Sequence, residues 1–232
     1  MYILGIETST KTGSVAVVSE AGVVAQYSLN IDATHSERLM ATVDRVMKDT
    51  GLTIAELGGF SVAIGPGSFT GLRIGLAAIK GLALATGKPV AAVPTLLALA
   101  GNLPYAAHPV CPLLDARKGE VYAALYRLDE GLPKQVMAES VLPLAMLAER
   151  VPDRTIFTGE ASHLFRTDIE KLFGDRALFA SLSALLPSSA TIAEIGLSLI
   201  RNNRLADPDT LTPMYIRRPE AEVAWEKKTR SR

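Results

Sequence analysis

The chain has 232 residues, 48% of them hydrophobic, which is enough apolar material for one large or two small domains. Its 24 Lys and Arg residues balance its 24 Asp and Glu residues, so no overall positive charge recruits nucleic acid. A single cysteine excludes an internal disulfide, and no apolar stretch approaches the roughly 20 residues of a membrane span, so we expect a cytoplasmic protein.

The first predicted element is a β-hairpin with a hydroxyl-rich tip. Residues 2–7 and 14–19 have the pattern of strands, and the segment from Glu7 to Gly13 joins them with four Ser or Thr residues. A third strand is expected over 22–29. A helix follows over 36–50, and Gly51 is a natural place for it to end.

A glycine-rich turn from Gly65 to Gly75 follows an apolar strand over 60–64. Gly65 and Gly67 allow backbone angles that other residues avoid, and Ser68 is suited to cap a helix over 68–86. The free N–H groups and positive dipole end of such a helix resemble a phosphate cradle. The glycine spacing matches neither the Walker pattern nor the dinucleotide fingerprint in full, so a well-capped strand-to-helix turn is the alternative.

The rest of the chain predicts a second lobe. A strand over 90–93 and a helix over 95–101 complete a first lobe of residues 1–104, and a linker over 101–109 leads into the second lobe of residues 105–232. The expected second-lobe strands lie at 110–114 and 120–127, and the expected helices near 143–150, 160–173 and 190–202. Cys111, in the first of these strands, is expected to be a buried, reduced thiol.

The end of the chain is basic. From Ile216 to Arg232 there are six Arg or Lys residues against three Glu, with Trp225 as one hydrophobic anchor. This segment predicts either a contact with tRNA phosphates through counterion release or a solvated tail.

Two helices of the first lobe carry the sharpest interaction signal. The apolar residues of 36–50 share one side, whereas the helix over 68–86 is apolar nearly all round. Either the first helix covers the second face of the other, or both present a surface to a matching pair on a partner, which Ala78→Arg would disrupt. The expected interface residues are Leu39, Met40, Val43, Met47, Gly71, Gly75, Ala78 and Leu82.

Candidates for catalysis are few. The histidines His35, His108 and His163 lack metal-ligand spacing, and no Gly-x-Ser-x-Gly nucleophile motif is present. His35 is expected to make a hydrogen bond near a helix start. No catalytic and no metal-binding residue is predicted.

Four segments carry a family resemblance, and they occur in family order. They are residues 6–10 (Ile-Glu-Thr-Ser-Thr), 34–39 (Thr-His-Ser-Glu-Arg-Leu), the glycine turn 65–75, and 93–100 (Val-Pro-Thr-Leu-Leu-Ala-Leu-Ala). With them the chain resembles the bacterial TsaB (YeaZ) family, the non-catalytic partner of the threonylcarbamoyl transferase TsaD. The resemblance is specific over about residues 1–125. It implies an α/β protein with the two-lobed actin-like or Hsp70-like ATPase fold, with mixed sheets flanked by helices.

The resemblance also implies which residues once held a nucleotide. They are Glu7, Thr8, Ser9, Gly65, Gly67 and Ser68, interpreted as vestigial phosphate loops, and no cofactor is expected. Asp115 lies where a second loop would be, but only Gly119 supplies a glycine there. The catalytic transferases carry His-x-x-x-His where this chain has residues 92–98 without histidine.

The implied function is that of a scaffold subunit. It would pair with a TsaD-type subunit, recruit a TsaE-type ATPase subunit, and support N6-threonylcarbamoylation of adenosine 37 in tRNA, which it meets through the complex. Alone it would form a homodimer. The alternatives are a stand-alone ATP-dependent kinase, which calorimetry with ATP and Mg²⁺ would reveal, and a nucleic-acid-binding module with salt-sensitive tRNA binding.

Overall fold

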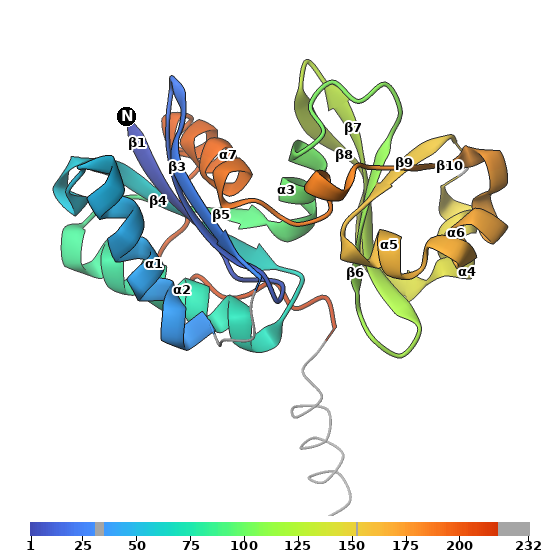
Figure 1. The fold of residues 1–232 in the computed structure, drawn as a ribbon, viewed down its shortest axis with the longest axis horizontal. Coiled ribbons are helices and arrows are strands. Elements are labelled where there is room, and N and C mark those ends of the chain that lie inside the picture. Colours follow the sequence, from blue (N-terminus) through green and yellow to red (C-terminus); the bar gives the residue numbers. More distant parts are fainter. Residues whose placement is uncertain (31–34, 152, 218–232) are drawn as a thin grey trace, which may run out of the picture.

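The computed structural model describes residues 1–30, 35–151 and 153–217, and it has two lobes built on two five-stranded sheets (Figure 1). The first sheet has the strand order β3-β2-β1-β4-β5. The strands β1, β2 and β3 form an antiparallel meander, and β4 and β5 run parallel to β1. Their bounds are β1 Tyr2–Glu7, β2 Gly13–Ser19, β3 Gly22–Leu29, β4 Leu57–Gly65 and β5 Val90–Pro94.

Two helices cover one face of this sheet: α1 (His35–Thr50) and α2 (Phe69–Thr86) lie side by side there (Figure 1). The short η1 (Ile54–Glu56) leads from α1 into β4. The core between the helices and the sheet is made of alternate strand residues and one stripe of each helix. Its fully buried members include Leu4, Ile6, Val62, Leu72 and Ile79.

The second sheet repeats the topology of the first. Its order is β10-β9-β6-β7-β8, so β8, β7, β6, β9 and β10 correspond to β3, β2, β1, β4 and β5. The meander is again antiparallel, and β9 again pairs in parallel with the first strand of its lobe. The bounds are β6 Val110–Asp115, β7 Glu120–Asp129, β8 Leu132–Pro143, β9 Thr155–Thr158 and β10 Ala177–Phe179. The chain is therefore an internal duplication at the level of the fold, which is not visible as sequence repetition.

Short helices cover the outer face of the second sheet (Figure 1). They are α4 (Leu144–Arg150), α5 (Glu160–Leu164) and α6 (Arg166–Phe173), with η2 (Gly174–Arg176) and η3 (Leu182–Ala184) in the connections. The sequence predicted one helix over 160–173, and the structure breaks it at Phe165. The strands β8, β9 and β10 were not predicted, and β9 and β10, with four and three residues, are too short to establish an alternating pattern.

The last helix of each half packs on the other half. α7 (Ser189–Arg201) lies against the free face of the first sheet, where the Ser61 hydroxyl donates to the Ile192 carbonyl oxygen at 2.8 Å. α3 (Thr95–Gly101) packs against the second sheet, with Leu96 and Leu99 among its contacts. The prediction followed chain order and assigned residues 190–202 to the second lobe. That assignment was wrong for α7, because each sheet has two apolar faces to cover and α7 covers one in the first lobe.

α2 has the length and composition of a membrane span, although the sequence predicts none. The structure gives another reason for this composition. Leu72, Leu76 and Ile79 pack on the first sheet, so the apolar character belongs in part to the core.

Candidate functional site

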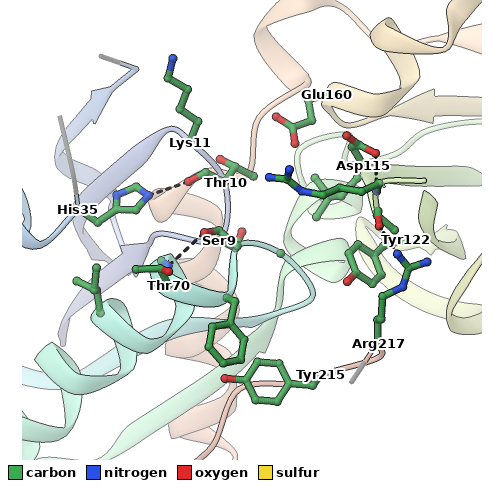
Figure 2. Close-up of a pocket in the computed structure, with 18 of the residues that line it drawn as sticks. Ser9, Thr10, Lys11, His35, Thr70, Asp115, Tyr122, Glu160, Tyr215 and Arg217 are labelled. Carbon is green, nitrogen blue, oxygen red and sulfur yellow. Dashed lines mark hydrogen bonds between the residues drawn. The ribbon is translucent and has the colours of Figure 1, made fainter. Parts of the chain in front are cut away.

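A cleft of about 880 Å³ lies between the two lobes (Figure 2). Its walls come from the tip of the first hairpin, the start of α1, the turn before α2, the end of β6 and the start of α5. The polar and aromatic lining residues are Ser9, Thr10, Lys11, His35, Ser36, Ser68, Phe69, Thr70, Asp115, Arg117, Tyr122, Glu160, Tyr215 and Arg217. This is the place where the two corresponding hairpins of the duplicated fold face each other.

The glycine turn at the cleft packs directly on the first hairpin. The Ser68 N–H donates to the Ser9 carbonyl oxygen at 2.6 Å, and the Ser68 hydroxyl accepts from the Gly71 N–H at 3.2 Å, which confirms the predicted cap. The Thr8 hydroxyl donates to the Gly71 carbonyl oxygen at 2.8 Å. Two of the N–H groups that a phosphate would need are therefore already bonded within the chain.

The glycines make this close packing possible. A Cβ atom at Gly67 would collide with the Ser9 carbonyl oxygen, and one at Gly71 would collide with the Thr8 carbonyl oxygen. Gly67 also has φ +156°, at the edge of the region that favours glycine. The turn is thus shaped to receive a backbone segment of its own lobe.

Glu7 lies beneath this hairpin and is completely buried. The Ser9 N–H donates to its Oε1 atom, whereas Oε2 has no hydrogen-bond partner among the described residues. Burial raises the pKa of the Glu7 carboxyl to about 7, against the lowering effect of the hydrogen bonds from Ser9 and Thr10. A carboxyl that is half protonated near neutral pH and sealed from the cleft is poorly suited to hold a hydrated metal ion.

The six predicted phosphate-loop residues therefore divide into two groups. Ser9, Gly67 and Ser68 line the cleft. Glu7, Thr8 and Gly65 are buried and are not part of its wall, so in this structure they are not placed to contact a ligand in the cleft. The motif could not show this, because a phosphate and a neighbouring backbone use the same N–H groups.

His35 has the predicted structural role. His35 is the first residue of α1, and its Nε2 atom lies 2.8 Å from the Thr10 carbonyl oxygen. Burial lowers the pKa of its imidazole. The other two histidines lie much later in the chain: His108 precedes β6, and His163 lies on α5. Among the described residues, no group of three or more His, Cys, Asp or Glu side chains is arranged to hold a metal ion.

The second-lobe wall of the cleft carries the carboxylates of Asp115 and Glu160 and the guanidinium group of Arg117. Asp115 accepts a hydrogen bond from the Arg117 N–H at 2.7 Å, and Glu160 lies across the site from the first hairpin (Figure 2). Burial, and then the charge of Asp115, raises the pKa of the Glu160 carboxyl. The tip residues Arg117, Lys118 and Gly119 have φ of 62°, 56° and 77°, so this hairpin turns tightly without a glycine-rich loop.

Tyr215 and Arg217, near the end of the described chain, form a part of the site that sequence reasoning missed. The Tyr215 ring stacks on Phe69 with centroids 5.1 Å apart, and Arg73 of α2 lies 3.9 Å from the Phe69 centroid. The sequence predicts only a basic end of the chain from Ile216 onward, because nothing local indicates that Tyr215 and Arg217 return to the first lobe and the cleft.

Cys111 is buried on β6, and burial raises the pKa of its thiol far above the ordinary value. The predicted buried thiol is confirmed.

Five of the eight residues predicted at a partner interface are buried inside the first lobe. Leu39, Val43 and Met47 pack in the core under α1, and Gly71 and Gly75 face Thr8. That part of the prediction was wrong, because the helical period shows the apolar stripes of a helix but not which of them faces the sheet. Met40 remains exposed, and Ala78 and Leu82 are half-buried.

α2 nevertheless has an outer apolar face. Ala77, Gly81, Leu84 and Ala85 are exposed along it, and Leu84 keeps 85% of its surface accessible. Met40 of the neighbouring α1 is 50% exposed. Small and apolar residues on a solvent-facing side of a helix indicate a surface that another helix can approach closely.

A family model described as tRNA N6-adenosine threonylcarbamoyltransferase matches residues 22–225. The tRNA threonylcarbamoyladenosine biosynthesis protein TsaB of Bacillus subtilis is 33% identical over 97% of this chain and 98% of its own length. The chain belongs to the TsaB family. The Escherichia coli TsaB protein is 30% identical over 98% of both chains, which agrees with this assignment.

Solved structures support the same family and the fold. YeaZ from Pseudomonas aeruginosa superposes with a TM-score of 0.77 at 27% identity, covering 92% of this chain and 99% of its own. A ROK hexokinase from Thermus thermophilus reaches a TM-score of 0.52 at 12% identity, over 84% of this TsaB-family chain and 98% of its own. The hexokinase shows the fold alone. The predicted two-lobed actin-like α/β fold is confirmed.

Proposed function

We propose that this TsaB-family protein is a non-catalytic subunit in the biosynthesis of N6-threonylcarbamoyladenosine in tRNA, and that it acts by pairing with a transferase subunit. The observation that carries the proposal is the outer apolar face of α1 and α2, formed by Met40, Ala77, Gly81 and Leu84. The names of the relatives supply the pathway.

A TsaD-type transferase is the partner that the fold favours. The transferase family model matches most of this chain, so the two kinds of protein are related over most of its length. Two related chains can then meet through equivalent surfaces about an approximate twofold axis. The same geometry permits a homodimer of this chain when the transferase is absent. A TsaE-type ATPase subunit would join that pair, tRNA would bind through the complex, and the assembly would act in the cytoplasm.

The state of the cleft supports a role without catalysis. The turn before α2 binds the first hairpin through Ser68 and Thr8, and the Glu7 carboxyl is buried and close to neutral. A kinase of this fold would instead need accessible phosphate loops on both walls of the cleft. Micromolar binding and turnover of ATP with Mg²⁺ by the isolated chain, measured by calorimetry, would contradict the proposed scaffold role.

The interface is tested by placing a charge on the outer face of α2. Ala78 packs partly against the core, so a charge there would also disturb the fold. Ala77 and Leu84 are exposed and are the better positions for the substitution. Ala77→Arg and Leu84→Arg should abolish co-elution with the TsaD-type subunit in gel filtration, because a buried unpaired charge costs several kcal/mol, roughly a hundredfold or more in affinity. Ala145→Arg, on the exposed side of α4 in the second lobe, is the matched control and should keep the complex. A normal complex with both α2 variants would refute the pairing surface.

A further inference from the structure

Residues 205–217 return from α7 along the first lobe and then reach the second. The Ala206 N–H donates to the Val90 carbonyl oxygen at 2.8 Å, and the Met214 N–H donates to the Ile64 carbonyl oxygen at 2.6 Å. Leu211 packs against the first-lobe core. This segment, here called the strap, is therefore fixed to the first lobe along its length as far as Tyr215.

Tyr215 ties the strap to the first turns of α2. Its ring stacks on Phe69, and its hydroxyl accepts a hydrogen bond from the Arg73 Nε atom at 2.9 Å. Arg73 also lies over the Phe69 ring, so one cation and two aromatic rings form a single packed cluster at the cleft edge. The position of Arg217 is thereby set by the first lobe.

Arg217 contacts the second lobe. Its Nη1 atom donates to the Ala116 carbonyl oxygen at 2.6 Å, and its Nη2 atom pairs with the Glu120 carboxylate. Both groups belong to the β6–β7 hairpin, whose tip forms the second-lobe wall of the cleft. The two side chains are only 25% and 31% exposed, so water screens this ion pair less than it screens a surface pair.

The two covalent connections between the lobes meet elsewhere, beside α3 and α7. Asn102, just after α3, donates from its side-chain nitrogen to the Leu186 carbonyl oxygen at 2.9 Å and accepts from the Thr191 hydroxyl at 2.7 Å. One residue thus holds both crossing segments together. α3 and α7 lie between the two sheets, whereas Tyr215 and Arg217 lie at the edge of the cleft beyond the start of α2 (Figures 1 and 2).

We propose that the strap is a latch. Arg217 holds the β6–β7 hairpin against the first lobe, and the crossing at Asn102 is the hinge about which the lobes separate when Arg217 is released. The latch sets access to the cleft and does not depend on the scaffold role proposed above. Because Tyr215 packs on Phe69 and Arg73, the strap that carries Arg217 is also attached to the first turns of α2.

The experiment measures the distance between the lobes in the full-length isolated chain. Spin labels are attached at Ala55→Cys on η1 and Ala145→Cys on α4, both exposed and in different lobes, while Cys111 is buried and stays unlabelled. Labelled protein is diluted with unlabelled protein, and the distances between the two spin labels of one chain are measured by pulsed electron paramagnetic resonance. Arg217→Ala should raise the open population about tenfold, as expected for the loss of a charge-assisted hydrogen bond.

Two further variants make the test decisive. Glu120→Gln removes the charge on the second lobe while leaving Arg217 and the strap in place, and it should shift the distances in the same direction. Arg127→Ala removes an arginine that pairs with Asp153 inside the second lobe, and it should leave the distances unchanged. Circular dichroism checks that each variant is folded. Distances in Arg217→Ala and Glu120→Gln that equal those of the parent chain would overturn the latch.

Discussion

The two hairpin tips that face each other across the cleft occupy corresponding places in the duplicated fold but are in opposite states. In the first, residues 7–10 are all at most 5% exposed. In the second, Asp115, Arg117, Lys118 and Gly119 are exposed. The first tip packs against its own lobe with only Lys11 exposed, and the second is a surface turn held by Arg217.

The elements that follow the fourth strand of each sheet explain the difference. In the first lobe an 18-residue helix, α2, carries Gly71 and Gly75 against the hairpin. In the second lobe the corresponding α5 has five residues. Gly159 before α5 still approaches the Leu113 backbone closely, as Gly67 approaches Ser9, but no long helix covers the second tip. The first tip is thus packed against a long helix, while most of the second tip remains exposed.

The largest effect should come from filling the contact at the first tip. Gly71→Ala places a Cβ atom on the Thr8 carbonyl oxygen, which cannot move without displacing β1 or α2. We expect a loss of at least about 3 kcal/mol in the free energy of unfolding, measured with urea. Gly81→Ala, on the exposed side of the same helix with no atom near the new Cβ, is the control and should be stabilising by about 0.5–1 kcal/mol. Equal stabilities of the two variants would disprove the packing argument.

The next effect is a dependence of stability on pH that comes from Glu7. Its pKa of about 7 in the folded chain exceeds the ordinary 4.5, so between these values the folded state holds a proton that the unfolded state has lost. The contribution to stability is therefore greatest below pH 4.5, falls as the pH rises towards 7, and is then constant, with a total change of about 3 kcal/mol.

Glu7→Gln should remove this slope. The measurement is the free energy of unfolding of parent and variant at several pH values from 4.5 to 7.5, and the difference between them should grow with pH. Glu149→Gln, at an exposed position on α4, should follow the parent at every pH. A difference between Glu7→Gln and the parent that stays constant with pH would show that the Glu7 carboxyl is not protonated by burial.

The smallest effect is expected at the second tip. A Cβ atom at Gly119 would meet no other atom within 4 Å, so the cost of Gly119→Ala comes only from its φ of 77°. That cost is about 1–2 kcal/mol, and it should appear in the midpoint of urea unfolding with an unchanged slope. A loss as large as that of Gly71→Ala would erase the contrast between the two tips.

Several features were predictable because they depend on residues close in sequence. The Ser68 cap, the strands β1 to β3, and the helices α1 and α2 follow from hydroxyl placement, alternation and helical period. The buried Cys111 follows from its apolar neighbours. The buried state of Glu7 was not predictable, because it depends on α2 and the first hairpin approaching each other across about 60 residues of chain.

The sequence by itself determined the family, the two-lobed α/β class and the presence, after the glycine turn, of a helix that is apolar nearly all round. Motifs and periodicity show these features because they are local properties. Only the tertiary structure decided which stripe of α2 faces solvent, that α7 joins the first lobe, that the glycine turn binds its own hairpin, and that Arg217 spans the lobes. Each of these is a contact between distant segments. A backbone N–H can donate to any acceptor within reach, and an apolar stripe can pack against any apolar surface. Which acceptor or surface lies beside it is therefore determined by the tertiary fold.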